Sequence, residues 1–179
     1  MKGIVFKELI ALMEQVVGEE LTEDIIEEAN LDSGGSYSGV GTYDHSEILS
    51  LVTVLSEKTG KEASELVHAF GEHMVGVFKK AHGDFFSKPD TYSFLESVHS
   101  YIHVEVRKLY PEAELPAISC KNGGDGSFEL HYYSNRPFAD LAGGLIAGVI
   151  KHYGEKIDVK VSDIGPNGLR ERTFFLKKG

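Results

Sequence analysis

Three polar residues that could bind an anion, Tyr132, Ser134 and Arg136, stand at two-residue spacing in "YYSNR". In an extended strand, side chains two residues apart share one face, so two hydroxyls and a guanidinium would project together. A guanidinium binds a carboxylate or phosphate through two parallel hydrogen bonds, and the two hydroxyls would add further directional hydrogen bonds. The row therefore suits a ligand with more than one carboxylate. A strand-end arginine that pairs with one of the chain's 28 acids explains the pattern equally well.

Two histidines, His99 and His103, lie four residues apart on a predicted helix over residues 91–110. Such a pair could chelate a metal ion, but without a third ligand nearby it is more typical of a solvated helix edge. The apolar stripe of this helix has His99 at its margin and His103 further round, so periodicity alone favours His99 as the buried histidine.

The first two-thirds of the chain is predicted to be helical. Besides the helix over residues 91–110, apolar residues recur at helical spacing in four segments: residues 4–17, 22–31, 45–60 and 61–83. Thr22 is expected to cap the second of these four, while Gly60 and Gly83 are expected to end the third and the fourth. The glycines and serines of residues 31–44 predict a loop.

After Pro116 the pattern changes to strands. Residues 117–135 predict two extended segments around a glycine-rich turn, and residues 155–178 predict a second hairpin that turns at 165–168. Residues 137–154 predict a helix with proline at its start and glycine past its end. We therefore predict an α+β fold, in which a helical N-terminal lobe is joined to a C-terminal lobe of helices and a roughly four-stranded antiparallel sheet.

Composition narrows the classes of function. The chain has 179 residues and a net charge of −10, which suits one domain and argues against nucleic acid or an anionic membrane as the main partner. The longest apolar run, residues 141–150, is too short to span a bilayer, and no signal-peptide pattern is seen, so a cytoplasmic location is expected. Cys120 is the single cysteine, which excludes an internal disulfide; a buried, inert thiol is expected there.

Several motifs together resemble the haem nitric oxide/oxygen-binding (H-NOX) family, which is related to the haem domain of soluble guanylate cyclase. The chain opens with "MKGIVF" and continues through "SEKTGK" to "YIHVEVRKLYPEAELP" and "YYSNR". His103 stands thirteen residues before Pro116 and twenty-nine before Tyr132. Each motif alone is weak, whereas their order and spacing across nearly the whole chain are specific.

The resemblance implies one haem-binding domain over residues 1–179, with a distal lobe of about 1–60, a proximal lobe of about 61–179 and haem b between them. It implies that His103 is the proximal iron ligand and that Pro116 packs on the haem face. Tyr132, Ser134 and Arg136 would then hold the two propionates, which answers the question of what ligand the polar row would bind.

The resemblance also implies which residues surround the bound gas: Leu141, Met74, Leu9, Val5 and Phe78. Oxygen-binding members of the family have a tyrosine at the position of Leu141, where it donates a hydrogen bond. Because Leu141, Met74 and Leu9 cannot donate, we expect an apolar pocket that binds nitric oxide and carbon monoxide but not dioxygen. The small residues Gly143, Gly144, Ala147 and Gly148 indicate close approach either to the haem or to another helix.

The expected function is that of a nitric oxide sensor rather than an enzyme. Nitric oxide would break the bond between the iron and His103, and the resulting change of shape would regulate a partner in trans, a histidine kinase or a diguanylate cyclase/phosphodiesterase, as in two-component signalling. A hydrolytic or redox enzyme built on His99 and His103 is disfavoured, because no catalytic motif accompanies them. A haem carrier or gas store is the alternative.

Overall fold

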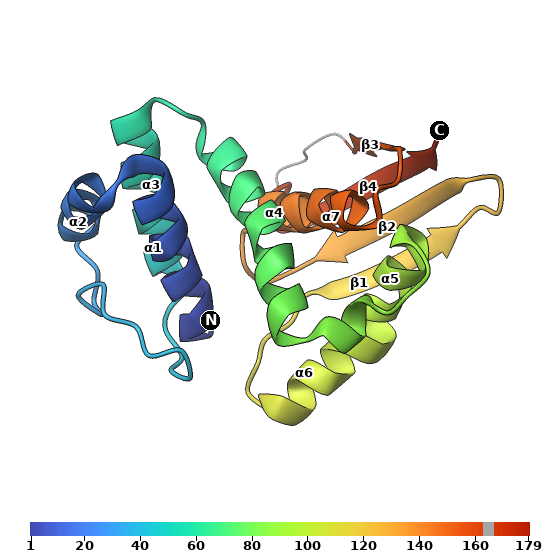
Figure 1. Ribbon diagram of the computed structural model, residues 1–179, viewed down its shortest axis with the longest axis horizontal. Helices are drawn as coiled ribbons and strands as arrows, with labels where there is room; N and C mark the ends of the chain where they lie inside the picture. The colour runs from blue at the N-terminus through green and yellow to red at the C-terminus, as the bar shows by residue number, and fades with distance from the viewer. Residues whose placement is uncertain (163–166) are drawn as a thin grey trace. The chain divides into compact units, whose positions relative to one another are not determined.

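The computed structural model describes residues 1–162 and 167–179. These form two compact units, Met1–Phe70 and Gly71–Gly179, and the boundary falls within helix α4 (Figure 1). Unit 1 contains α1 (Gly3–Val17), α2 (Glu19–Glu28), α3 (Ser46–Thr59) and the start of α4 (Ala63–Ala81). Unit 2 contains the rest of α4 and then η1 (Gly83–Phe86), α5 (Thr91–Ser97), η2 (Val98–Ile102), α6 (His103–Leu109), β1 (Ala117–Asn122), β2 (Ser127–Tyr133), α7 (Ala139–Tyr153), β3 (Ile157–Val161) and β4 (Glu171–Lys178). The predicted α+β class is confirmed.

Glycines set several of the helix ends. Gly60 and Gly154 follow α3 and α7 in the left-handed conformation, with φ of 68° and 66°, which glycine adopts without steric cost. The predicted cap at Thr22 is wrong, because α2 begins three residues earlier, after Gly18. Thr22 lies inside the helix, and its hydroxyl donates a hydrogen bond back to the Gly18 carbonyl at 2.8 Å.

In unit 1, a buried carboxylate fixes the predicted loop onto the helices. Glu47, at the start of α3, is 8% exposed and accepts hydrogen bonds from the hydroxyls of Ser33 at 2.5 Å and Tyr37 at 2.6 Å. The Tyr37 ring stacks on Phe6 of α1, with ring centroids 4.5 Å apart. These contacts satisfy a buried charge, as burial requires, and tie the loop to both helices.

Unit 2 is built on a four-stranded antiparallel sheet in the order β1-β2-β4-β3. Phe128, Leu130 and Tyr132 of β2 alternate along the strand and lie on its inner face, where Phe174 and Leu176 of β4 join them in one core. Helices α5 and α7 pack against this sheet (Figure 1). The end of β2 at Tyr132 is therefore held within this core, directly before the polar residues that follow it.

The predicted helix over residues 91–110 is interrupted. Between α5 and α6, residues Val98–Ile102 form the π-helix η2, and His103 is the first residue of α6. Because a π-helix closes its hydrogen bonds at i→i+5, each residue advances by about 18° less than in an α-helix, and five residues shift the phase by about 90°. The interruption therefore changes which face of α6 is buried.

Glycines let α7 pack closely on α4 within unit 2. A Cβ atom on Gly148 would lie 2.7 Å from Cγ2 of Val75 and 3.1 Å from the Glu72 carbonyl oxygen, and one on Gly71 would lie 2.4 Å from the Leu141 carbonyl oxygen. Real Cβ atoms do not approach so closely, so each position requires glycine at this helix spacing. Gly148 of α7 thus serves helix packing, one of the two interpretations predicted for the small residues of this helix.

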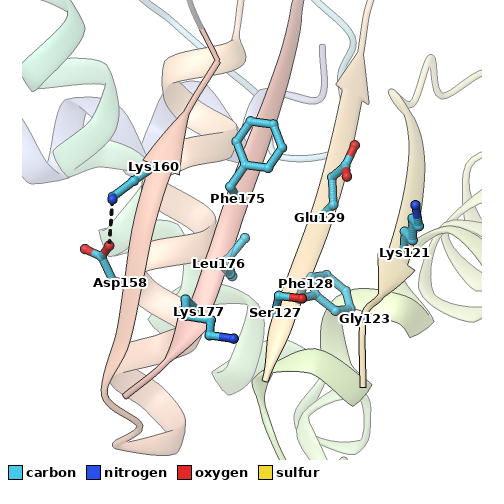
Figure 2. Close-up of a pocket in the computed structure, with 10 residues that line it drawn as sticks. All are labelled: Lys121, Gly123, Ser127, Phe128, Glu129, Asp158, Lys160, Phe175, Leu176 and Lys177. Carbon is cyan, nitrogen blue, oxygen red and sulfur yellow. Dashed lines mark ion pairs between the residues drawn. The ribbon is translucent and has the colours of Figure 1, made fainter. Parts of the chain in front are cut away.

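The outer face of the sheet is open to solvent. Figure 2 shows Lys121, Glu129, Phe175 and Lys160 in a row across the four strands, as the strand register requires. They border a hollow of about 460 Å³, and Phe175 is 45% exposed there. The residues that line this hollow include no histidine. Since iron in haem needs an axial protein ligand, these lining residues do not suit the predicted cofactor.

Candidate haem-binding site

His103 is the buried histidine of the predicted pair. It is 8% exposed, whereas His99 is exposed, with the two ring centroids 6.4 Å apart. Periodicity favoured His99 and was wrong, because the phase shift of about 90° across η2 turns His103 into the apolar face of the helix. The sequence held no local signal for the π-helix, and only the family resemblance selected His103.

Burial prepares the His103 imidazole for metal binding. Burial, with smaller effects from His99 and Arg107, lowers its pKa from 6.5 to about 4, so the ring is neutral at physiological pH. Its Nδ1 atom is buried and has no hydrogen-bond partner in the described part of the chain. Residues 1–162 and 167–179 contain no group of three or more His, Cys, Asp or Glu side chains that could hold a bare metal ion. A metal at His103 would therefore need most of its ligands from a cofactor.

The polar row forms, although not as a continuous strand. Strand β2 ends at Tyr133, so Ser134 and Arg136 lie in the connection to α7. A turn gathers them instead: the Ser134 hydroxyl accepts a hydrogen bond from the Arg136 backbone N–H at 3.1 Å. Burial raises the pKa of Tyr132, while hydrogen bonding with Ser134 and the charge of Arg136 oppose that shift. The two hydroxyls and the guanidinium are therefore close together at one end of the sheet.

Arg136 already has an anionic partner. Its Nη2 atom donates to Oε2 of Glu114 at 2.9 Å, and the two side chains are 18% and 71% exposed, respectively. This is the pairing with one of the chain's own acids that the sequence left open. An exposed partner contributes little stability, so a better-placed carboxylate could displace it. Pro116, the residue predicted to touch the haem face, is half-buried two residues after Glu114.

The residues predicted to surround a bound gas come from both units. Leu9 and Val5 lie on α1, Met74 and Phe78 on α4, and Leu141 on the first turn of α7. Leu9 and Met74 are buried, Val5 and Leu141 are half-buried, and Phe78 is 38% exposed. None of these five side chains carries a hydrogen-bond donor of oxygen or nitrogen.

Three of the five tyrosines that the sequence left as alternative donors are bonded within their own surroundings. The hydroxyls of Tyr37, Tyr92 and Tyr153 donate to Glu47, to the Gly126 carbonyl and to the Phe86 carbonyl, and the Tyr43 hydroxyl accepts the Ser38 N–H. Tyr101 is 44% exposed, with the Lys88 ammonium 5.5 Å from its ring centroid. The hydroxyls of Tyr37, Tyr92 and Tyr153 therefore already donate to other protein groups.

Cys120 has the properties expected of an inert thiol. It is half-buried on β1, where its sulfur lies 3.8 Å from the Leu95 carbonyl oxygen. Burial raises its pKa to about 11. Because the thiolate is the form that ligates metals, Cys120 is a poor competitor of His103.

Sequence reasoning missed one polar pair in the core. Arg172 of β4 is 7% exposed, and its Nη1 atom donates to Oδ1 of Asp140 on α7 at 2.5 Å. A signal was present, since Arg172 precedes Phe174 and Leu176 at period two and so belongs to the inward-facing row.

A family model described as Haem-NO-binding matches residues 2–161. The chain therefore belongs to this family of haem-binding gas-sensor domains, whose structurally characterised members are called H-NOX proteins. Among solved structures it is similar to the unliganded Fe(II) H-NOX protein from K. algicida, with 33% identity, a TM-score of 0.93 and coverage of 100% of this chain and 97% of that one. It is also similar to the Shewanella woodyi H-NOX in the Fe(II)CO state, with 36% identity, a TM-score of 0.84 and coverage of 100% and 95%.

Relatives with curated descriptions are much longer proteins. The chain is 24% identical over 170 residues to the soluble guanylate cyclase gcy-35 of Caenorhabditis elegans, a match that covers 91% of this chain and 25% of that one. The chain thus spans about a quarter of the length of this relative, and within the family the matching region is a sensor domain rather than a catalytic one. None of the helices in the described residues is long and apolar enough to cross a membrane.

The residues present fit a haem group. A neutral, buried imidazole whose neighbours provide no competing metal site suits an axial ligand, and the cluster of Tyr132, Ser134 and Arg136 suits carboxylates.

Proposed function

We propose that this chain is a haem-based nitric oxide sensor in which residues 1–179 form one domain that binds haem b through His103. The observation that carries the proposal is the buried His103 imidazole, which its surroundings keep neutral at physiological pH. A neutral ring offers its lone pair to iron without first losing a proton. His99, by contrast, is exposed.

The haem carboxylates would be held at the end of the sheet. Tyr132 and Ser134 offer hydroxyl donors, and Arg136 offers a guanidinium once it leaves the exposed Glu114. Pro116, which lies between α6 and β1, would pack against the ring, as the family resemblance implies. These residues anchor one edge of the cofactor independently of the iron bond.

The choice of gas follows from the side chains on the distal side. Bound dioxygen gains from a hydrogen-bond donor, whereas nitric oxide and carbon monoxide need one much less. The predicted lining residues Leu141, Met74, Leu9, Val5 and Phe78 offer no such donor, which supports binding of nitric oxide and carbon monoxide without dioxygen. Spectra of the ferrous protein in air and under each gas test this. A ferrous protein that forms a stable complex with dioxygen in air would contradict it.

Release of His103 would start the signal. Haem, held by His103, would supply an iron that binds nitric oxide in competition with the imidazole. His103 lies at the junction of η2 and α6. Without its bond to iron, α6 would no longer be attached to the cofactor, while Arg136 and Tyr132 would still bind the haem carboxylates. The outcome is a shift between two arrangements of the helix, driven by the different affinity of the gas for each.

We propose that the output is regulation of a cytoplasmic partner in trans, a histidine kinase or a diguanylate cyclase/phosphodiesterase. Unit 1 contains fourteen acidic and four basic residues and therefore carries the whole net charge of the chain. Helix α2 exposes six acids: Glu19, Glu20, Glu23, Asp24, Glu27 and Glu28. This surface suits a basic face on the partner.

Pull-downs of candidate kinases and cyclases by the haem-free, ferrous and nitric oxide-bound forms test the output. A partner whose activity depends on the bound form supports the sensor. Equal regulation of every partner by all three forms, together with rapid transfer of haem to a scavenger protein, would favour a haem carrier.

A further inference from the structure

Arg172 is a buried arginine whose guanidinium is only partly satisfied. Its Nη1 atom donates to Asp140, but its Nε and Nη2 atoms are buried without a hydrogen-bond partner among residues 1–162 and 167–179. Buried donors of a charged group that lack an acceptor are costly, and native proteins rarely leave them so. The free edge of Arg172 therefore indicates a ligand that accepts two hydrogen bonds.

The strand register places Arg172 beside the predicted propionate site. Arg172 of β4 pairs directly with Tyr132 of β2, and paired residues on neighbouring strands project from the same face of a sheet. Both residues are buried on the inner face. The charges of Arg136 and Arg172 both act to lower the pKa of Tyr132, which places both guanidiniums within electrostatic reach of its hydroxyl.

We infer that Arg172 is a second guanidinium for the haem carboxylates, with its Nε and Nη2 atoms donating hydrogen bonds to one propionate next to Tyr132. The inference rests on the proposed function, since it needs haem to bind in unit 2. The Nε–Nη2 edge of a guanidinium matches the two oxygens of a carboxylate. Haem carries two carboxylates, and the predicted row supplies one guanidinium, so Arg172 balances the second charge.

Asp140 has the complementary role of orienting Arg172. It lies on the first turn of α7 and holds Nη1, which fixes the plane of the guanidinium. The same carboxylate also partly neutralises Arg172 and so competes with a propionate for its charge. Removing that negative charge while keeping an acceptor should strengthen the hold of Arg172 on haem.

The test measures haem loss from the haem-loaded protein of residues 1–179 to an excess of apomyoglobin scavenger. The variants are Arg172→Lys, which keeps the charge but loses the fork, and Asp140→Asn, which keeps an acceptor for Nη1. Each is loaded with haem and, separately, with haem dimethyl ester, in which both propionates are blocked. Far-UV circular dichroism of every sample checks that the variants are folded.

With haem, we expect Arg172→Lys to lose the cofactor about 10- to 100-fold faster than wild type, and Asp140→Asn to lose it no faster than wild type. With haem dimethyl ester, Arg172→Lys and wild type should differ by less than about threefold, because the carboxylate that Arg172 contacts is blocked.

Equal acceleration of haem loss by Arg172→Lys for haem and for its dimethyl ester would overturn the inference, since the effect would then act through folding. Faster loss of haem from Asp140→Asn than from wild type would also contradict it. Both results leave the sensor proposal standing. A wild-type protein that takes up no haem would instead defeat the proposed function, and this inference with it.

Discussion

Replacing Arg136 with alanine should weaken haem binding, because it removes the guanidinium of the predicted propionate row. In the structure Arg136 is paired with Glu114 and must exchange that partner for a propionate. The side chain of Arg136 is 18% exposed, so its bonds form in a largely desolvated place, whereas Glu114 is 71% exposed.

The magnitude follows from this exchange. Charge-assisted hydrogen bonds contribute about 1.5 to 3 kcal/mol each, and a bidentate contact contains two. Loss of the exposed Glu114 pair costs up to about 1 kcal/mol, and the remaining exposure of Arg136 screens its charge further. A net contribution of about 2 to 4 kcal/mol remains, which corresponds to about 30- to 700-fold in the haem dissociation constant.

Glu114→Gln provides the matched control. It removes the negative charge that pairs with Arg136 without touching the guanidinium, so haem should bind up to about fivefold more tightly. Haem titration of the two variants, followed in the Soret band, measures both effects. The reasoning is refuted if Arg136→Ala binds haem within about threefold of wild type, or if Glu114→Gln weakens binding as much as Arg136→Ala does.

Three further predictions concern His103 and the packing of α7. His103→Gly should lose iron ligation until imidazole is added, whereas His99→Gly should keep the wild-type ferrous spectrum; the opposite pattern would reassign the ligand. Protons compete with iron for the imidazole, and a His103 pKa of about 4 moves that competition to lower pH. Iron ligation by His103 should therefore persist at pH 5.5 in a spectroscopic pH titration. Loss of ligation near pH 6.5 would contradict this prediction. Gly148→Ala should reduce the free energy of unfolding in urea by about 1 to 3 kcal/mol, because the added Cβ would meet Val75. Gly76→Ala is the control: its Cβ would meet nothing within 4 Å, so it should raise the free energy of unfolding by about 0.5 to 1 kcal/mol. Equal effects of the two substitutions would argue against the tight helix contact.

Much of the fold could be predicted because its signals are local. Helical spacing, glycine stops such as Gly60 and strand alternation around Phe128 each depend on residues close together in the chain. The turn predicted at residues 165–168 falls partly outside the described residues. The start of α2 was misplaced because Thr22 resembles a helix cap, while Gly18 and the acids after it begin the helix.

The site was harder to predict because its geometry depends on departures from regular structure. The π-helix η2 rotates His103 inward, and a helical wheel assumes that no such rotation occurs. Ser134 and Arg136 meet through a turn after β2 rather than by strand alternation. The alternation of Arg172 with Phe174 could have predicted that Arg172 is buried. A charged residue at the start of a strand is, however, easily taken for an exposed strand end.

The most direct test of the account is the electron paramagnetic resonance spectrum of the ferrous, haem-loaded protein after addition of nitric oxide. We expect hyperfine splitting from the nitrogen of nitric oxide alone, because His103 has left the iron. Additional splitting from a second nitrogen, present in wild type and absent from His103→Gly, would show that the imidazole stays bound and would contradict release of His103 as the signal.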